Sequence, residues 1–219
     1  MIVFDVDGTL IGGESTDWEC FGAAFKEVAG FVLSEKFFAG IEEITAQAIV
    51  HQALGSLSAE EKRLKERLVC QEYLRRLQAA HQSDPGCFSA IEGAVTLIQE
   101  LKEKGIPIAI ATGDWRETIS FKLRAAGILH DNIPMVTSSE FYSRSDIIAA
   151  AVAKAGRPLD EAIYVGDGLW DLRACGKLGI RFIGTGHREK KLREAGATHV
   201  LRDLSPPEFW RAKAALEQR

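Results

Sequence analysis

Short apolar runs alternate with helical patterns along most of the chain. The first run, Ile2 to Phe4, stops abruptly at Asp5, and comparable runs recur in the second half at 106–111, 135–136, 162–165 and 181–183. A continuous apolar run of this length is typical of a strand buried on both faces, as in a parallel sheet. Helical patterns fit between the later runs, so the order predicts an α/β fold with a parallel sheet and right-handed crossovers.

The helical patterns carry readable ends. Residues 92–104 place Val95, Ile98 and Leu101 on one stripe and stop at Gly105, which favours a helix that ends at a glycine. A Ser, Thr or Asp followed three residues later by Glu predicts a helix start by a capping box. Such pairs occur at Thr16, Ser58 and Asp114, and Ser205 followed by Pro206 predicts a further start.

The segment between the first strand and residue 88 has a different pattern. It contains no convincing strand run, several helix starts and, at its end, the turn signal Asp84-Pro85-Gly86. We interpret residues 13–87 as an all-helical cap domain inserted into an α/β core domain formed by 1–12 and 88–219. The two connections between core and cap would then be candidate hinges.

Composition excludes several function classes. Apolar residues make up 46% of the chain, charged residues make up 26%, and the formal net charge is −4, which does not favour a nucleic-acid or membrane-surface binder. The longest apolar run, Ile147 to Ala153, is far shorter than a bilayer span, and Asp5 and Asp7 interrupt any secretory signal. The four cysteines and five histidines show no metal-ligand spacing, which favours a reduced, cytoplasmic protein.

Polar residues follow the ends of the predicted strands. Asp5 and Asp7 follow the first strand, Thr112-Gly113-Asp114 follows the second, and Gly166-Asp167 followed by Asp171 ends a later one. An Asp-Gly pair alone is most often a turn. The carboxyl ends of parallel strands form the ligand crevice of such sheets, so three of these motifs together predict one converging site.

The chemistry of such a cluster follows from its charges. Carboxylates at contact repel one another, and a divalent cation with a preference for hard oxygen ligands, such as Mg²⁺, removes that conflict. A cation with a nearby hydroxyl, backbone N–H groups and a basic side chain suits a phosphoryl group. An aspartate can then attack phosphorus, and a second one can protonate the leaving alcohol and later deprotonate a water.

The motifs together resemble those of the haloacid dehalogenase superfamily. They are Asp5-Val6-Asp7-Gly8-Thr9, Thr112-Gly113, Arg144 and Gly166-Asp167 with Asp171, and the likeness covers essentially the whole chain. Segment 13–87 resembles the C1-type cap of that superfamily, and the chain looks like its capped phosphatases, the phosphoglycolate phosphatase-like group. The resemblance implies a Rossmann-like core.

The resemblance also implies a role for each motif residue. Asp5 would be the nucleophile and a Mg²⁺ ligand, and Asp7 would be the general acid and base, with its backbone carbonyl on the metal. Thr112 and the Gly113 N–H would hold a phosphoryl oxygen, and Asp167, supported by Asp171, would complete the metal site. The expected residues are therefore catalytic Asp5, Asp7, Thr112 and Arg144; phosphate-binding Gly8, Thr112, Gly113 and Arg144; and metal-binding Asp5, Asp7, Asp167 and Asp171.

Two positions refine this expectation. In the superfamily, the dehalogenases have a non-acidic residue at the place of Asp7, so the acid here suits a phosphatase or phosphomutase. The superfamily usually has a lysine where Arg144 stands. Arginine keeps the charge and can bridge a carboxylate and a phosphate, although its guanidinium is broader than an ammonium. The alternative is that Arg144 is only a surface residue at a helix start. Lys154 is a poor substitute for the usual lysine, because it lies in the middle of a predicted helix.

Several hypotheses stay open at this point. The leading one is a Mg²⁺-dependent phosphohydrolase of small phosphate monoesters that acts through an aspartyl-phosphate. The alternatives are a sugar phosphomutase of the same superfamily and a non-catalytic phosphate- or partner-binding module. We expect a small phosphorylated metabolite as partner, no nucleic acid and no membrane, and the choice between monomer and homodimer stays open. For Trp115 and Trp170 we expect core packing, and for Trp18 and Glu14 ordinary helix positions.

Overall fold

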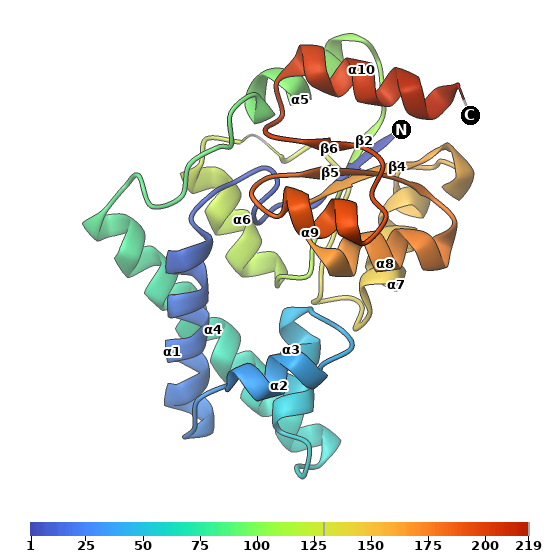
Figure 1. Cartoon of the computed structure of the whole chain (residues 1–219). Coiled ribbons are helices and arrows are strands. Elements are labelled where there is room, and N and C mark those ends of the chain that lie inside the picture. The colour runs from blue at the N-terminus through green and yellow to red at the C-terminus, as the bar shows by residue number, and fades with distance from the viewer. Residues whose placement is uncertain (129, 219) are drawn as a thin grey trace.

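A parallel sheet with helices on both faces forms the upper part of the molecule in Figure 1. The computed structural model describes residues 1–128 and 130–218. Among these residues the strand order is β3-β2-β1-β4-β5-β6, and every neighbouring pair is parallel, which confirms the predicted α/β class. The strands are β1 (Ile2–Phe4), β2 (Ile108–Ala111), β3 (Met135–Val136), β4 (Ile163–Gly166), β5 (Arg181–Thr185) and β6 (Val200–Leu201). The apolar runs predicted the first five, and β6 was not predicted.

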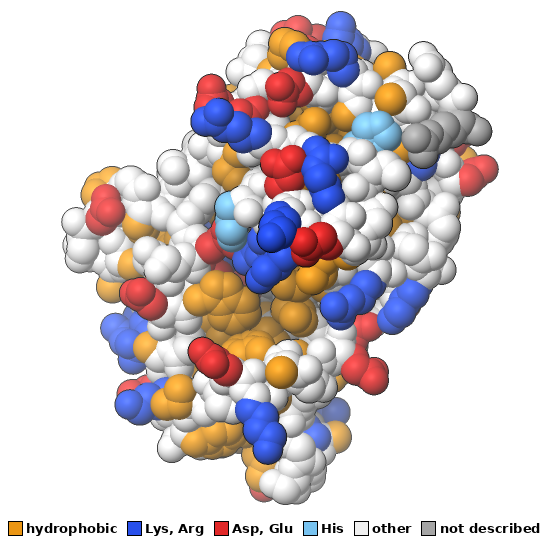
Figure 2. Space-filling view, viewed as in Figure 1, with side chains coloured by type: hydrophobic (Ala, Val, Ile, Leu, Met, Phe, Trp, Pro, Cys, Tyr) orange, Lys and Arg blue, Asp and Glu red, His pale blue; other side chains and the backbone are white. Residues whose placement is uncertain are grey.

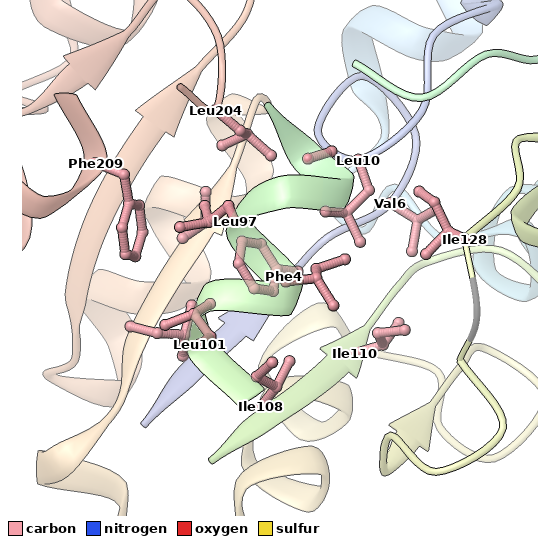
Figure 3. Packing of buried hydrophobic residues seen from close by; sticks show 14 of the residues in the cluster. Phe4, Val6, Leu10, Leu97, Leu101, Ile108, Ile110, Ile128, Leu204 and Phe209 are labelled. Carbon is pink, nitrogen blue, oxygen red and sulfur yellow. The ribbon is translucent and has the colours of Figure 1, made fainter. Parts of the chain in front are cut away.

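Helices cover both faces of the sheet. Alternate residues of a strand point to opposite faces, so Ile2 and Phe4 of β1 pack on one side and Val3 packs on the other. Figure 3 shows Phe4 with Leu97 and Phe209 on the first side. That side is covered by α5 (Ala94–Glu103), α6 (Arg116–Ala125) and α10 (Pro206–Glu217), and the other by α7 (Arg144–Lys154), α8 (Leu169–Leu178) and α9 (Glu189–Glu194). A short 3₁₀ helix, Leu159–Glu161, precedes β4.

The segment before α5 folds into helices with a hydrophobic cluster of their own (Figure 1). They are α1 (Glu14–Ala29), α2 (Glu35–Gly40), α3 (Ala46–Ala53) and α4 (Ala59–Ser83). Phe21 and Phe25 of α1 pack with Tyr73 and Leu77 of α4, and Trp115, which precedes α6, joins the same cluster. The helical character of 13–87 therefore agrees with the sequence, while its division from the core as a separate cap domain stays a prediction.

The expected helix starts had mixed outcomes. The Ser58 capping box is present, because Ser58 Oγ accepts from the N–H of Glu61 and Glu61 Oε2 accepts from the N–H of Ser58. The expected start at Thr16 is wrong, since α1 begins at Glu14 after Gly13. The start at Asp114 is also wrong: Trp115 is the N-cap of α6, and the Asp114 carboxylate instead accepts from the Trp115 N–H and contacts Lys122. Ser205 precedes α10 as expected but makes no side-chain cap hydrogen bond.

The strand register brings the motif residues to one edge of the sheet. β1 lies in the middle of the sheet, with Phe4 opposite Ile110 of β2 on one side and Val165 of β4 on the other. Continuing the register, Asp5 is level with the last residues of β2 and β4, and Thr112 and Asp167 follow one residue later, about 3.3 Å further on. After β1, the chain adds β2 and β3 on one side of this strand and then β4, β5 and β6 on the other. The place where the strand order changes sides in this way is where ligands bind in open α/β sheets.

Gly93 joins the start of α5 to the connection before α10, and this contact gives a stability prediction. Its φ is +81°, and a Cβ there would lie 2.4 Å from the backbone carbonyl carbon of Leu204. Gly105 also has a positive φ (+64°), but a Cβ there would meet nothing within 4 Å. We expect Gly105→Ala to lower the free energy of unfolding by about 1 kcal/mol, because of its backbone conformation alone. Gly93→Ala should cost about 3 kcal/mol, because the Leu204 backbone must also move.

Urea titration of both variants measures this difference in the free energy of unfolding. Equal losses in the two variants would show that the close approach at Gly93 contributes nothing beyond backbone strain.

Candidate active site

Asp5 lies at the end of β1 and is held by Arg144. Arg144 Nη1 donates to Asp5 Oδ1 at 3.0 Å, and its Nε lies 3.4 Å from Asp171 Oδ1. Only 5% of Arg144 is exposed, which contradicts the alternative that it is a surface residue at a helix start. Burial alone would lower the pKa of Arg144, but the carboxylates of Asp171 and Asp5 raise it above its ordinary value. Arg144 is therefore a permanently charged partner of two buried acids.

Three buried carboxylates gather beside this arginine. Oxygen atoms of Asp5, Asp167 and Asp171 lie within 4.8 Å of one another. Burial raises the pKa of all three carboxyls, that of Asp171 to about 7, and the charge of Asp5 adds to the increase at Asp167. Asp167 Oδ1 is buried without a hydrogen-bond partner. Carboxylate oxygens this close, with one of them lacking a partner, fit a divalent cation that prefers oxygen ligands.

Gly8 permits the close approach between the β1 loop and Asp167. Its φ is +76°, and a Cβ at this position would lie 2.5 Å from Asp167 Oδ2. Any other residue would push Asp167 away from Asp5 or distort the loop. The close approach to Asp167 thus explains why a glycine stands at position 8, whether or not it binds phosphate. Phosphate binding by Gly8 stays a prediction.

Thr112 and Gly113 follow β2 and border the same cavity as Asp5. Thr112 is buried, and its N–H donates to the carbonyl of Val136, which extends the β2–β3 pairing by one residue. The carbonyl of Gly113 accepts from the N–H of Ala46 at 2.7 Å, at the start of α3. The loop after β2 is therefore fixed on one side by the sheet and on the other by the helical segment.

Asp7 faces a second buried cation that the sequence analysis missed. Lys122 of α6 is fully buried, and its Nζ lies 2.7 Å from Asp7 Oδ1, 2.7 Å from Asp17 Oδ1 and 2.9 Å from Asp114 Oδ2. It also lies 3.3 Å from the hydroxyl of Tyr73, which itself donates to Asp17. Burial raises the pKa of Asp7 well above its ordinary value, although Lys122 opposes this. The sequence did contain a signal for the contact between Asp114 and Lys122. These two residues and Thr118 are spaced four apart, which places side chains on one face of a helix.

Arg188 is a third cation that the sequence analysis missed. It precedes α9, donates to Asp167 Oδ2 and, at 2.9 Å, to Glu14 Oε1 of α1. Its guanidinium carbon lies 5.4 Å from the centre of the Trp170 ring. No motif marked Arg188, because its position depends on where the loop after β5 meets α1.

Many of these residues line one cavity between the sheet edge and the helical segment. Asp5, Asp7, Thr112, Gly113 and Arg144 line it from the sheet side, whereas Asp167 and Asp171 lie next to Asp5 and do not line it themselves. Trp18 and Glu14, expected to be ordinary helix positions, both lie in its wall, as does Trp170. Trp115 packs in the core as expected, and its ring stacks on Phe21 with the ring centres 6.0 Å apart. Figure 2 shows hydrophobic side chains gathered in the hollow between the helical segment and the α8–α9 side of the core.

In the described part of the chain, no helix is both long enough and apolar enough to cross a bilayer.

Comparisons with known proteins bear on the family and the fold. The sequence model of the haloacid dehalogenase-like hydrolase family matches residues 2–185. The chain is 24% identical over 211 residues to the Arabidopsis thaliana protein SUPPRESSOR OF QUENCHING 1, chloroplastic. The matched region covers 93% of this chain and 19% of that protein. The chain therefore spans about a fifth of the length of that relative. The cytoplasmic location expected from the cysteines stays a prediction.

Solved structures show the same fold. A hydrolase from Pseudomonas syringae has 25% sequence identity and a TM-score of 0.74, over 93% of this chain and 94% of that one. A β-phosphoglucomutase from Clostridium difficile has 16% identity and a TM-score of 0.75, over 99% and 96%. A predicted phosphoglycolate phosphatase from Haemophilus somnus 129pt has 19% identity and a TM-score of 0.67, over 94% of each chain. Since the family model spans most of the sequence, this chain belongs to the haloacid dehalogenase-like hydrolase family.

Proposed function

We propose that the protein is a Mg²⁺-dependent phosphatase of small phosphate monoesters that works through a phosphorylated Asp5. One observation carries this proposal: Asp5 is held by Arg144 beside two further buried carboxylates, and Asp7 faces the same cavity. A nucleophile, a cationic partner and a second acid within one cavity are the parts that phosphoryl transfer needs.

The first step is attack of the Asp5 carboxylate on phosphorus. Arg144 binds Asp5 and, with a planar guanidinium, can also bind a phosphoryl oxygen, so it lowers the repulsion between two anions. The Thr112 hydroxyl and the Gly113 N–H are the proposed donors to the other phosphoryl oxygens. As the bond from Asp5 forms, the bond from phosphorus to the ester oxygen breaks, and its electron pair goes to that oxygen.

Asp7 supplies and later removes the proton. Burial favours its protonated form, which suits a general acid that gives its proton to the leaving oxygen. In the second step the Asp7 carboxylate takes a proton from water, and the water oxygen attacks the phosphorus of phospho-Asp5. The bond between Asp5 and phosphorus then breaks, inorganic phosphate leaves, and both aspartates return to their starting forms.

The divalent cation would be held by Asp5, Asp167 and Asp171, with the backbone carbonyl of Asp7 as a further ligand. When bound, it neutralises the carboxylates and polarises a phosphoryl oxygen. The fit rests on the clustered carboxylate oxygens and on the unpartnered Oδ1 of Asp167.

The phosphomutase alternative draws on the likeness to the β-phosphoglucomutase, which at 16% identity concerns the fold alone. A mutase would return the phosphoryl group to a second hydroxyl and would require a bisphosphate activator. Accumulation of free phosphate without such an activator supports the hydrolase. The non-catalytic alternative is disfavoured because Asp5, Asp7 and Arg144 line one cavity, with Asp167 and Asp171 next to Asp5.

Replacing the nucleophile gives the first functional prediction. Asp5→Asn keeps the size of the side chain and its contact with Arg144 but removes the attacking carboxylate. We expect phosphate release from p-nitrophenyl phosphate to fall roughly a thousandfold or more, with an unchanged circular dichroism spectrum. Asp160→Asn, at an exposed acid outside the site, should leave the rate unchanged. An Asp5→Asn protein as active as the parent would rule out Asp5 as the nucleophile.

Metal removal gives the second functional prediction. EDTA should abolish phosphate release, and Mg²⁺ should restore it. Isothermal titration should show Mg²⁺ binding to the parent protein and binding at least about tenfold weaker to Asp167→Asn, because a charged ligand is lost. Asp160→Asn again serves as the matched control. Full activity in EDTA, or equal Mg²⁺ affinity in Asp167→Asn and the parent, would contradict the assigned metal site.

A further inference from the structure

The cavity has one apolar wall that the proposed chemistry does not use. Trp18 and Phe21 of α1 form it together with Ile44 and with Ile49 of α3. The Trp18 ring meets Phe21 edge to face with the centres 6.0 Å apart, and 41% of Trp18 is exposed. A large aromatic side chain this exposed inside a cavity gains free energy when a ligand covers it. Hydrophobic side chains gather at this hollow in Figure 2.

The position of Asp7 places the leaving group next to this wall. The proton of Asp7 must reach the leaving oxygen, so the leaving group lies on the Asp7 side of the phosphorus. Lys122 binds both Asp7 and Asp17, each at 2.7 Å, which fixes α1 beside Asp7. Trp18 follows Asp17 directly, and Phe21 lies about one helical turn further along α1. The alcohol part of a substrate would therefore extend along α1.

The charges of the cavity disfavour a second anion on the leaving group. Among the described residues, five carboxylates and two guanidinium groups line it. Two of those carboxylates, Glu14 and Asp17, belong to α1. Arg144 is bound to buried acids, and Arg188 is bound to Asp167 and Glu14. Lys122 is a third cation, in contact with the lining acids Asp7, Asp17 and Asp114, so the carboxylates still outnumber the cations. A carboxylate or second phosphate along α1 would therefore meet net negative charge.

The same wall offers little to a sugar. The hydroxyl of Thr45 already donates to the carbonyl of Tyr142 at 2.9 Å, and the hydroxyl of Tyr73 already donates to Asp17. The indole N–H of Trp170 has no partner, but it lies against Gly168, next to Asp167, at the phosphate end of the cavity. Sugar hydroxyls placed against Phe21, Ile44 and Ile49 would lose hydrogen bonds to water, and only hydroxyls that reach the edge of the wall could replace them at the Trp18 indole N–H or the Glu14 and Asp17 carboxylates.

We infer that the wall formed by Trp18, Phe21, Ile44 and Ile49 is the leaving-group subsite. It selects phosphate monoesters of aromatic or other apolar alcohols over sugar phosphates and esters with a second anionic group. The direction in which the leaving group lies rests on the proposed phosphatase function. Trp18 is the specificity-determining residue of this subsite.

A binding experiment with non-hydrolysable probes tests the subsite without turnover. Phenylphosphonate and methylphosphonate share the phosphoryl end and differ in the ring. With Mg²⁺ present, we expect phenylphosphonate to bind the parent protein about tenfold more tightly by isothermal titration, which corresponds to stacking and burial of one ring. Trp18→Ala should remove the difference, and Trp18→Phe should restore most of it.

A control and a kinetic measurement complete the test. Phe141 has the same exposed fraction as Trp18, 41%, and lies outside the cavity, so Phe141→Ala should keep the tenfold preference. In turnover, Trp18→Ala should raise KM for phenyl phosphate about tenfold with little change in kcat, and leave KM for glycerol 3-phosphate unchanged.

Failure of this inference and failure of the phosphatase proposal are distinguishable. Equal binding of the two phosphonates to the parent protein, or an equal loss of both in Trp18→Ala, would overturn the subsite even if phosphate release depends on Asp5. A clear preference for phenylphosphonate that Trp18→Ala removes would support the subsite, even if no ester is hydrolysed.

Discussion

The site depends on balancing buried negative charge with buried positive charge. The fold brings one carboxylate oxygen each of Asp5, Asp167 and Asp171 to within 4.8 Å of one another. Burial raises the pKa of all three carboxyls, and the charge of Asp5 further raises the pKa of Asp167 and Asp171. Arg144 compensates the negative charge of Asp5 and Asp171, and a divalent cation fits beside Asp167. Removing one partner of such a buried pair leaves an uncompensated charge, which is costly, so each of these residues constrains the others.

The same balance ties the helical segment to the core. Asp17 of α1 and Tyr73 of α4 share Lys122 with Asp7, and Glu14 of α1 shares Arg188 with Asp167. Asp7 and Asp167 are thus each connected, through one cation, to the start of α1. We therefore expect the position of α1 to affect both the proton transfer and the leaving group that the cavity accepts.

The sequence predicted those parts of the site that the sheet itself positions. Asp5, Thr112 and Asp167 follow three adjacent strands, and the register of parallel strands is enough to bring them together. The superfamily resemblance pointed to Arg144. The roles of all these residues stay predictions, but their gathering at one edge follows from elementary sheet geometry.

What the sequence did not predict depends on packing between distant segments. Apart from its spacing from Asp114, nothing in the local sequence distinguishes Lys122 from the other lysines of the chain. Only the fold shows that Asp7, Asp17 and Asp114 converge on it. Arg188 and Trp18 matter because α1 lies against the loop after β5 and the sheet edge. The start of α6 was misplaced for the same reason, since Asp114 contacts Lys122 and so does not cap the helix as its local sequence suggests.

Formation of a phosphoryl bond at Asp5 is the central claim, and mass spectrometry of the acid-quenched protein tests it most directly. The parent protein is mixed with Mg²⁺ and p-nitrophenyl phosphate, quenched during turnover and digested. We expect a phosphoryl group on the peptide that contains Asp5, absent when Asp5→Asn protein is treated in the same way. Phosphate release by the parent protein with no phosphorylated Asp5 peptide, or with the phosphoryl group on another residue, would contradict the account.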